Sequence, residues 1–333
     1  MIFVTGGTGL VGAQLLFDLA SSGLEVTAMH RPTSDFSVYN HLFANNSALK
    51  DRISWIEGDV NSLESLNRFI TTSADVYHCA GMISFDPNDR ELLYHVNIEG
   101  TADLVNVCLE KQIRKLVYVS SVGTLGRNSA TTSTINENSH WQTSNENSDY
   151  AISKYGAERE VWRGIAEGLN AVIVNPSVII GAGNWGSGSS KLIKQVWDGL
   201  RFYTNGVSGF IDVKDVTTIM IQLMGNSVTA ERFILSSENI SFKTFFEIAA
   251  EALNKKPPSI YASPWMGELA WRMESLRNIL LHHKPLITKY TAINAHKIYR
   301  YEAGKIKQLL NYDFVPVADT IKNACNEFLL QRP

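Results

Sequence analysis

Tyr150 and Lys154 are the first candidates for chemistry, because they lie four residues apart in a segment with a helical pattern. That spacing places both side chains on one face of a helix. An ammonium group beside a phenol favours the phenolate and lowers the pKa of the phenol. Such a tyrosine can pass a proton to or from a carbonyl or alcohol oxygen. A surface tyrosine and lysine without a catalytic role can show the same spacing. The neighbouring predicted elements therefore determine which interpretation applies.

A glycine-rich segment, Thr5-Gly6-Gly7-Thr8-Gly9-Leu10-Val11-Gly12, follows an apolar run at Ile2–Val4 and opens a helical pattern at Leu10–Ser21. Its spacing fits two registers, one with Gly6, Gly9 and Gly12 and one with Gly7, Gly9 and Gly12. In either register the glycines allow a tight turn, backbone approach to a pyrophosphate and close helix–strand packing. The helix N-terminus then offers free N–H groups to phosphate. We predict a dinucleotide site at Gly6, Thr8, Gly9, Leu10, Val11 and Gly12, with a purely structural turn as the alternative.

Ser121 follows a predicted strand at Leu116–Val119. The carboxyl ends of parallel strands face the ligand crevice. We therefore expect Ser121 to donate a hydrogen bond to the reacting oxygen and to stabilise its developing charge. Its neighbour Ser120 has the weaker claim, and a strand-end serine with no role in the chemistry is the alternative.

The end of the second predicted strand, Glu25–Met29, should lie near the adenosine ribose of a dinucleotide. An acid there would bind the 2′-hydroxyl of NAD, but the sequence reads Met29-His30-Arg31-Pro32. Arg31 can pair with the 2′-phosphate of NADP through its forked donors, which favours NADP as the cofactor. A solvated arginine is the alternative, and Asp35, as a displaced ribose ligand, keeps NAD open.

Strand and helix patterns alternate through the first half of the chain and predict βαβ units. We expect an α/β fold with a doubly wound parallel sheet, the Rossmann fold, and a smaller, mostly C-terminal α/β substrate lobe. The dinucleotide domain should span 1–180 plus about 205–225, and the lobe 181–204 and 230–333. Phe210–Val213 should be a strand returning to the core, with short helices and loops beyond residue 230. The polar segment Arg127–Asp149 is predicted as a long loop, either a substrate lid or a mobile insertion. The expected strands of the first half are Ile2–Val4, Glu25–Met29, Ile53–Ile56, Val76–Cys79, Leu116–Val119 and Ala171–Val174.

Composition limits the other classes of function. The 333 residues carry a formal charge of −3, which argues against a nucleic-acid partner. Three scattered cysteines fit a reducing compartment, and no cluster at metal-ligand spacing suggests a metal site. The apolar stretch Trp265–Leu281 carries four charges and is read as an amphipathic helix of the lobe, with membrane-surface contact as the alternative, and not as a membrane span. With no recognisable signal peptide, we expect a cytoplasmic protein.

Together, the glycine loop, Ser121, Tyr150 and Lys154 resemble the extended short-chain dehydrogenase/reductase superfamily, also described as the NAD-dependent epimerase/dehydratase family. The resemblance covers nearly the whole chain and is nearest to the branch of dihydroflavonol-reductase-like and 3β-hydroxysteroid-dehydrogenase-like proteins. Val26–Arg31, Phe210–Val216 and Lys305–Thr320 carry the likeness to that branch.

The resemblance implies further roles. Gly58-Asp59-Val60 is similar to the adenine-contacting turn, with Asp59 bonding the adenine amino group. His78-Cys79-Ala80-Gly81 is similar to the segment that lines the cofactor, so Ala80 and Gly81 should touch it. Asn97 should be structural and support a proton-relay water, Pro176 and Ser177 should touch the nicotinamide, and Lys154 should hold its ribose. The resemblance also implies a homodimer that pairs the helices at 96–111 and 150–168.

The sequence departs from the family pattern in two places. Cys79-Ala80-Gly81 replaces the commoner double alanine, and Asn175 stands where arginine is frequent before the proline. The second departure puts substrate or backbone contacts in doubt, but not the chemistry. Lys191, Lys194 and Arg201 are possible phosphate contacts for a nucleotide sugar, although a solvated helix face accounts for them better.

Three functions follow from these patterns. The first is an NADP-dependent reductase or dehydrogenase that interconverts a carbonyl and a secondary alcohol on a small organic substrate, with Tyr150 as the acid/base, Lys154 lowering its pKa and Ser121 orienting the oxygen. The second is a nucleotide-sugar epimerase or dehydratase that retains its NAD(P). The third is a non-catalytic NADP-sensing protein, which the intact Tyr150–Lys154 pair disfavours. The sequence does not define the substrate.

Overall fold

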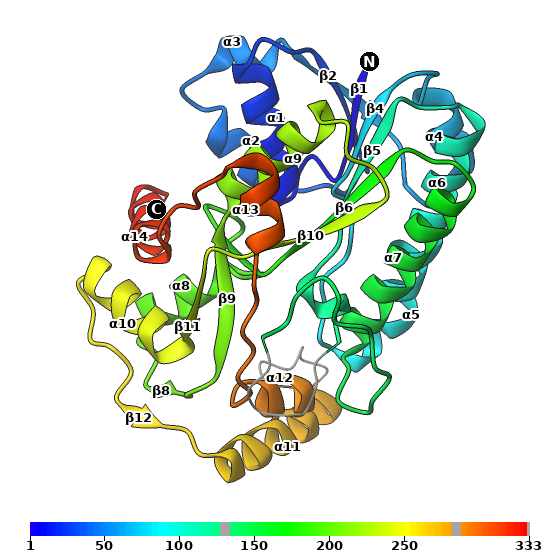
Figure 1. Cartoon of the computed structure of the whole chain (residues 1–333). Helices are drawn as coiled ribbons and strands as arrows, with labels where there is room; N and C mark the ends of the chain where they lie inside the picture. Colours follow the sequence, from blue (N-terminus) through cyan, green and yellow to red (C-terminus); the bar gives the residue numbers. More distant parts are fainter. Residues whose placement is uncertain (127–133, 282–287, 332–333) are drawn as a thin grey trace.

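Seven parallel strands form the central sheet, in the spatial order β10-β6-β5-β4-β1-β2-β3 (Figure 1). The computed structural model describes residues 1–126, 134–281 and 288–331. The strand order reverses direction between β1 and β4, which is the topological switch point of a doubly wound sheet. The predicted Rossmann fold is thereby confirmed. The strands are β1 (Ile2–Thr5), β2 (Val26–His30), β3 (Ile53–Glu57), β4 (Asp75–His78), β5 (Lys115–Val119), β6 (Ala171–Pro176) and β10 (Glu231–Leu235).

Helices cover both faces of this sheet, as Figure 1 shows. One layer contains α1 (Leu10–Ser21) and α9 (Val213–Gly225), with the short helices α2 (Ser37–Leu42) and α3 (Ser47–Lys50) beside α1. The other layer contains α4 (Leu63–Phe69), α6 (Gly100–Glu110) and α7 (Asp149–Ala166). A short helix α5 (Arg90–Tyr94) and a π-helical turn at His95–Glu99 lead into α6. Because the seven strands are parallel, their carboxyl ends all lie at the same edge of the sheet.

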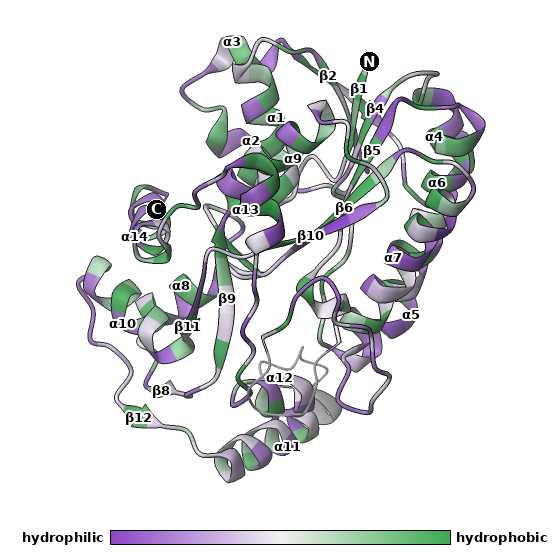
Figure 2. Cartoon of the chain, viewed as in Figure 1, coloured by the Kyte–Doolittle hydropathy of each residue, from purple (hydrophilic) through white to green (hydrophobic). Residues whose placement is uncertain are grey.

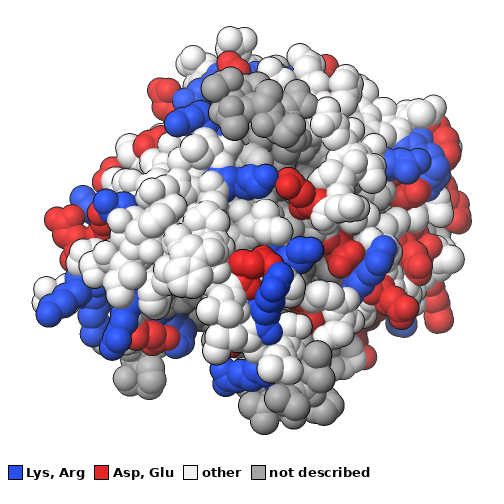
Figure 3. Space-filling model, turned by 90° about the horizontal axis from the view of Figure 1, so that it is seen from below, with Lys and Arg blue, Asp and Glu red and all other residues white. Residues whose placement is uncertain are grey.

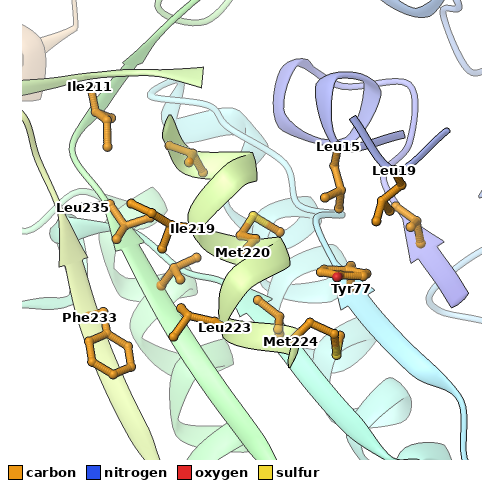
Figure 4. Close-up of a cluster of buried hydrophobic side chains, with 14 of the residues drawn as sticks. Leu15, Leu19, Tyr77, Ile211, Ile219, Met220, Leu223, Met224, Phe233 and Leu235 are labelled. Carbon is orange, nitrogen blue, oxygen red and sulfur yellow. The ribbon is translucent and has the colours of Figure 1, made fainter. Parts of the chain in front are cut away.

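The core between the sheet and α9 is mostly apolar (Figure 4). Ile219, Met220 and Leu223 of α9 are completely buried. They repeat at helical spacing, so one stripe of α9 faces the sheet. Across that stripe lie Leu15 of α1 and Leu235 of β10. Each large side chain buried in this way stabilises the fold by about 1.5–3 kcal/mol.

A second, smaller core belongs to the lobe. It is built on the sheet β11-β9-β7, with β7 (Val178–Ile180), β9 (Val207–Asp212) and β11 (Glu238–Ser241), and on the helices α8 (Lys191–Trp197), α10 (Phe242–Ala252) and α14 (Val317–Leu330). Phe210 and Phe245 stack at its centre with ring centroids 5.2 Å apart. Figure 2 shows that α10 and α14 each carry hydrophobic and hydrophilic residues, as helices that bury one face do. The other elements are β8 (Phe202–Tyr203), β12 (Ile260–Tyr261), α11 (Pro264–Leu281), α12 (Lys289–Asn294) and α13 (Gly304–Leu310).

One expectation about the second half of the chain needs correction, and another can now be made more precise. Residues beyond 230 were expected to form only short helices and loops, but Glu231–Leu235 forms β10 and pairs with β6 of the central sheet. The expected strand at Phe210–Val213 is β9, which pairs with β7 and β11 of the smaller sheet. Both strands are short, so neither had enough alternation to show which sheet it joins. The exact domain boundaries stay a prediction. In the part of the chain that the structure describes, no helix has both the length and the apolar content to cross a membrane.

Candidate active site

The glycine loop connects β1 to α1, and the structure distinguishes the two possible registers. Gly6 has a φ of +72°, and a Cβ there would lie 2.5 Å from the backbone nitrogen of Ala80. A Cβ on Gly12 would lie 2.1 Å from the carbonyl oxygen of Gly6. Both positions therefore require glycine for the turn and for helix–strand packing. These contacts favour the register Gly6, Gly9 and Gly12.

Gly9 differs from Gly6 and Gly12. A Cβ there would meet only the Gly6 carbonyl oxygen, at 3.5 Å, which is ordinary contact. Gly9 is also the N-cap of α1, and no side chain among the described residues caps that helix end. The protein itself thus leaves room beside Gly9 and leaves N–H groups of the first turn without a side-chain acceptor. Both features fit the phosphates of a dinucleotide at this helix N-terminus, near Thr8, Leu10 and Val11.

The ends of β2 and β3 present the residues predicted to read the adenosine. The side chain of Arg31 is exposed directly after β2. Asp35, the alternative ribose ligand, accepts hydrogen bonds from the backbone and hydroxyl of Ser37 and from Asn184. Asp59 accepts from the backbone of Asn61 in the turn after β3, and Val60 is buried beside it. The carboxylate of Asp35 is therefore already engaged, while the guanidinium of Arg31 faces solvent.

Ser121 and Tyr150 are brought together at the carboxyl edge of the sheet. Ser121 caps the turn after β5 by accepting a hydrogen bond from the backbone of Gly123 at 3.0 Å. Tyr150 lies in the first turn of α7, whose N-cap Ser148 accepts from the backbone of Ala151. Burial raises the pKa of Tyr150 to about 12, and a hydrogen bond with Ser121 acts in the opposite direction. The phenol is thus protonated at neutral pH and in contact with the serine.

Lys154 lies one turn after Tyr150 on α7 and is buried. Its Nζ donates to the hydroxyl of Tyr118 and to the carbonyl oxygen of Val119, both at 2.8 Å. Burial lowers the pKa of Lys154 to about 8, while the Glu158 carboxylate raises it. The sequence predicted that Lys154 would lower the pKa of Tyr150. In the structure, the ammonium bonds to β5 instead, and burial dominates the pKa of the tyrosine.

Tyr118 is a residue of the site that the sequence patterns did not indicate. It is fully buried in β5, and its hydroxyl bonds to Lys154. Beside it, His78 of β4 bonds to Thr5 of β1 at 2.7 Å and to Thr101 of α6 at 3.0 Å. Burial lowers the pKa of His78 to about 3, so this imidazole is neutral at physiological pH. A period-two strand pattern marks such residues only as inward-facing, and gives no sign of their polar partners.

Asn97 lies within the π-helical turn before α6. Its amide nitrogen donates to Ser153 of α7 at 2.9 Å and to the carbonyl oxygen of Met82 at 3.0 Å. Its side-chain oxygen accepts from the backbone of Met82 at 2.7 Å. Asn97 thus ties the segment after β4 to the helix of Tyr150, which fits the structural role implied by the family resemblance.

The remaining predicted cofactor contacts lie at the ends of β4 and β6. The backbone of Ala80 donates to the Thr5 hydroxyl at 3.3 Å, and Gly81 is exposed next to it. A Cβ on Gly81 would lie 3.7 Å from the Nζ of Lys154. Pro176 ends β6, and the buried hydroxyl of Ser177 has no hydrogen-bond partner among the described residues. These groups line the same edge as Ser121 and Lys154.

Aromatic side chains border Tyr150 on its outer side. Phe85 packs edge-on against Tyr150 with ring centroids 5.8 Å apart. Tyr290 of α12 stacks on Phe85 at 5.3 Å. Since α12 is more than 100 residues away in the sequence, no local pattern pointed to this contact. The site is therefore walled on this side by rings from two distant segments.

The lobe residues proposed as phosphate contacts do not form a cluster of free cations. Lys194 of α8 pairs with Asp198, and both are substantially exposed. Arg201 is exposed directly before β8, and its carbonyl oxygen accepts a hydrogen bond from the backbone of Ile260. Figure 3 shows the molecule from the end that carries α11 and α12. Positively and negatively charged side chains are interspersed there with uncharged surface. A solvated helix face accounts for Lys191 and Lys194. Among the described residues, no group of three His, Cys, Asp or Glu side chains is placed to hold a metal ion.

A parallel sheet with a glycine loop after β1, and a serine, a tyrosine and a lysine at its carboxyl edge, defines a dinucleotide-dependent α/β enzyme. The family model described as the NAD dependent epimerase/dehydratase family matches residues 2–235, and the chain belongs to this family. The predicted membership in the extended short-chain dehydrogenase/reductase superfamily is thus confirmed.

Relatives of similar length accompany this family match. The chain is 28% identical over 335 residues to a putative dihydroflavonol 4-reductase of Synechocystis sp., covering 98% of this chain and 94% of the relative. It is 26% identical over 313 residues to sterol demethylase protein B of Methylococcus capsulatus, covering 91% and 88%. Among solved structures, gox2253 superposes with a TM-score of 0.81 at 26% identity, covering 99% of this chain and 98% of that one.

Proposed function

We propose that this enzyme is an NADP-dependent reductase or dehydrogenase acting on a carbonyl or secondary alcohol of a small organic molecule. One observation carries the proposal: Ser121 and Tyr150 meet at the carboxyl edge of the sheet, with Lys154 one turn further along α7. Such a set would offer a proton donor to a substrate oxygen held beside the nicotinamide. The likeness to a putative dihydroflavonol 4-reductase supports a reductase.

The residues at this edge fit a nicotinamide dinucleotide. The uncapped N-terminus of α1 and the open side of Gly9 would hold the pyrophosphate, and the partnerless hydroxyl of Ser177 would face the nicotinamide. When bound, the cofactor supplies or accepts the hydride. In the reductive direction, Tyr150 donates its phenolic proton to the oxygen while Ser121 holds that oxygen in place. Lys154 would contribute a positive charge on the same helix face and would bond the ribose of the bound dinucleotide.

NADP is the coenzyme that the second strand favours. Arg31 is exposed at the end of β2, where the adenosine ribose of a dinucleotide would lie, and its guanidinium can bond a 2′-phosphate with two parallel donors. The carboxylate of Asp35, which would serve NAD, already accepts hydrogen bonds from Ser37 and Asn184. These two observations support NADP over NAD.

The aromatic border of Tyr150 favours a substrate with an apolar, ring-bearing body. Phe85 and Tyr290 offer ring faces and edges for stacking. In the lobe, Lys194 is paired with Asp198, which leaves fewer cations for the diphosphate of a nucleotide sugar. An epimerase or dehydratase, the second candidate, is favoured by the family description alone.

A panel of aldehydes, ketones and nucleotide sugars, followed by NADPH absorbance, tests the proposal. A reductase consumes NADPH in proportion to product, whereas an epimerase retains its coenzyme and shows no net consumption. For the active substrate, Tyr150→Phe should lower kcat by about 10²–10⁴-fold and leave NADPH affinity within twofold, because only the proton donor is removed. Unchanged turnover in Tyr150→Phe would rule out the assigned chemistry, and a panel in which no compound is turned over would return the non-catalytic NADP-binding alternative.

A further inference from the structure

A buried carboxylate on α7 lies close to the proposed catalytic residues without belonging to them. Glu158 is 2% exposed and follows Lys154 by four residues, so both lie on the inner face of the helix. An ionised carboxylate at such depth is costly unless it is paired and fully hydrogen-bonded. The groups that bond to the Glu158 carboxylate therefore indicate its role.

One carboxylate oxygen of Glu158 accepts hydrogen bonds from three residues in or just after β5 and β6, close to Ser121. It accepts hydrogen bonds from the hydroxyl of Ser120 at 2.5 Å, from the hydroxyl of Thr124 at 2.7 Å and from the amide of Asn175 at 2.8 Å. Ser120 directly follows β5, Thr124 ends the turn capped by Ser121, and Asn175 lies in β6. This single oxygen thus fixes α7 to both neighbouring strand ends.

The backbone of Ser121 is held by the same group of residues. The amide of Asn175 also donates to the carbonyl oxygen of Ser121, at 3.1 Å. Ser121 is therefore flanked on one side by Ser120, which bonds to Glu158 directly, and held at its carbonyl by Asn175, which bonds to Glu158 as well. A shift of Glu158 would move both supports of the serine together.

The second oxygen of Glu158 faces a cation from β10. Nη1 of Arg232 lies 3.2 Å away, and the indole nitrogen of Trp162 lies 3.3 Å away. The same guanidinium donates through Nε and Nη2 to the carbonyl oxygen of Glu137, in the described part of the long loop before α7. The Glu137 carboxylate in turn accepts from the backbone of Ile234. Arg232 therefore connects the carboxylate to the loop that leads into Tyr150.

This arrangement also accounts for the family departure at Asn175. Where arginine is frequent in the family pattern, this chain has a neutral amide that bonds to Ser121 and Glu158 at once. The positive charge opposite Glu158 comes from a different strand, on Arg232. Asn175 thus has a structural role. The departure from the family pattern does not change the residues proposed to act on the substrate.

We propose that Glu158, paired with Arg232, is a positioning residue that fixes Ser121 relative to Tyr150. The proposal rests on the proposed function, in which these two side chains act on the substrate oxygen. A buried ion pair contributes little net stability compared with well-packed apolar residues. Its contribution here is geometric, because one carboxylate joins α7, both strand ends and the loop. Small displacements of such supports are costly in rate rather than in binding.

The first test compares Glu158→Gln with Glu160→Gln. Glu160 lies on the same helix and pairs with Arg163 at the surface, so it controls for the loss of one carboxylate from α7. We expect Glu158→Gln to lower kcat by about 10–100-fold with KM for NADPH within twofold, and Glu160→Gln to leave both within twofold. Equal kcat values in the two variants would overturn the proposal.

The pH profile separates positioning from general loosening of the fold. The groups near Lys154 are the carboxylate of Glu158, the thiol of Cys79, the phenols of Tyr118 and Tyr150, and the imidazole of His78. Of these, Glu158 has the largest effect in raising the pKa of Lys154. Glu158→Gln should therefore move the alkaline limb of kcat/KM to lower pH, whereas Glu160→Gln should not. A limb that stays in place in both variants would contradict the assigned geometry.

Arg232→Lys provides a second variant if Glu158→Gln does not fold. Lysine keeps the charge but cannot bond Glu158 and the Glu137 carbonyl with one planar fork. We expect about a tenfold loss in kcat.

Amide hydrogen exchange adds a readout that needs no substrate. Residues 120–126 and 134–140 should exchange at least tenfold faster in Arg232→Lys than in Arg163→Lys, the surface control. Equal exchange would overturn the proposal even if no substrate were found, whereas faster exchange in a protein that reduces no carbonyl would sink only the proposed function.

Discussion

The central sheet with its covering helices, called here the cofactor half, differs from the lobe in what determines its amino-acid residues. In the cofactor half, contacts between backbone atoms decide the residues: Gly6 and Gly12 leave no space for a side chain. In the lobe, the packing of large rings decides them, as in the stack of Phe210 on Phe245. The first kind of constraint leaves a recognisable motif, because only one residue fits. The second accepts many apolar residues of suitable volume and leaves only an apolar pattern.

The largest expected effect contrasts two glycines of the same loop. In Gly12→Ala the new methyl would lie 2.1 Å from the Gly6 carbonyl oxygen, and the backbone must move. We expect a loss of more than about 4 kcal/mol in the free energy of unfolding. Gly9→Ala meets only an ordinary contact at 3.5 Å, and its φ of −80° suits alanine.

Gly9→Ala should therefore fold with a free energy of unfolding within about 1 kcal/mol of wild type, but bind NADPH at least tenfold more weakly, because its methyl occupies the space left for the pyrophosphate. Urea denaturation measures the first quantity and NADPH fluorescence titration the second. Equal NADPH affinity in Gly9→Ala and wild type would mean that the open side of Gly9 is not the phosphate site.

The matching change in the lobe is Phe245→Ala. Its ring is fully buried, so removing it should cost about 3–5 kcal/mol of stability through lost burial and the cavity left behind. Phe245→Leu keeps most of the volume and should cost less than about 1.5 kcal/mol. Thermal and urea unfolding would check both values. A loss as large for leucine as for alanine would show that ring stacking, and not volume, holds the lobe.

The same contrast explains what the sequence could and could not predict. The sheet, the glycine loop and the approach of Ser121 to Tyr150 followed from local motifs and from the rule that parallel strand ends meet at one edge. Strand β10 was missed because five residues at a sheet edge carry little alternation. Tyr118, Arg232 and Tyr290 were missed because each meets the site through a contact distant in sequence. The bond of Lys154 to β5 depends on such a contact as well.

Arg31→Ala tests whether the cofactor half also selects the coenzyme. Losing a forked, charge-assisted contact to the 2′-phosphate should weaken NADPH binding by about 10–30-fold, or roughly 1.5–2 kcal/mol. NADH lacks that phosphate, so its affinity should change by less than twofold. Arg52→Ala, a change to another arginine on the same half whose side chain bonds to Gly23, serves as the control. An unchanged ratio of the NADPH and NADH dissociation constants would remove Arg31 from the site.

The expected effect that is smallest near neutral pH concerns Lys154 of α7. Because burial lowers the pKa of Lys154 to about 8, its ammonium is mostly charged well below that pH and mostly neutral well above it. The pKa of Tyr150, at about 12, lies outside the usual assay range. If the lysine charge is needed, kcat/KM should be flat up to about pH 7, fall by half near pH 8 and fall about tenfold for each further unit. Lys154→Arg keeps its charge at these pH values, so its lower activity should show no alkaline limb below pH 10. A wild-type profile that stays flat to pH 10 would show that the charge of Lys154 is not required, and that its bonds to Tyr118 and Val119 are only structural.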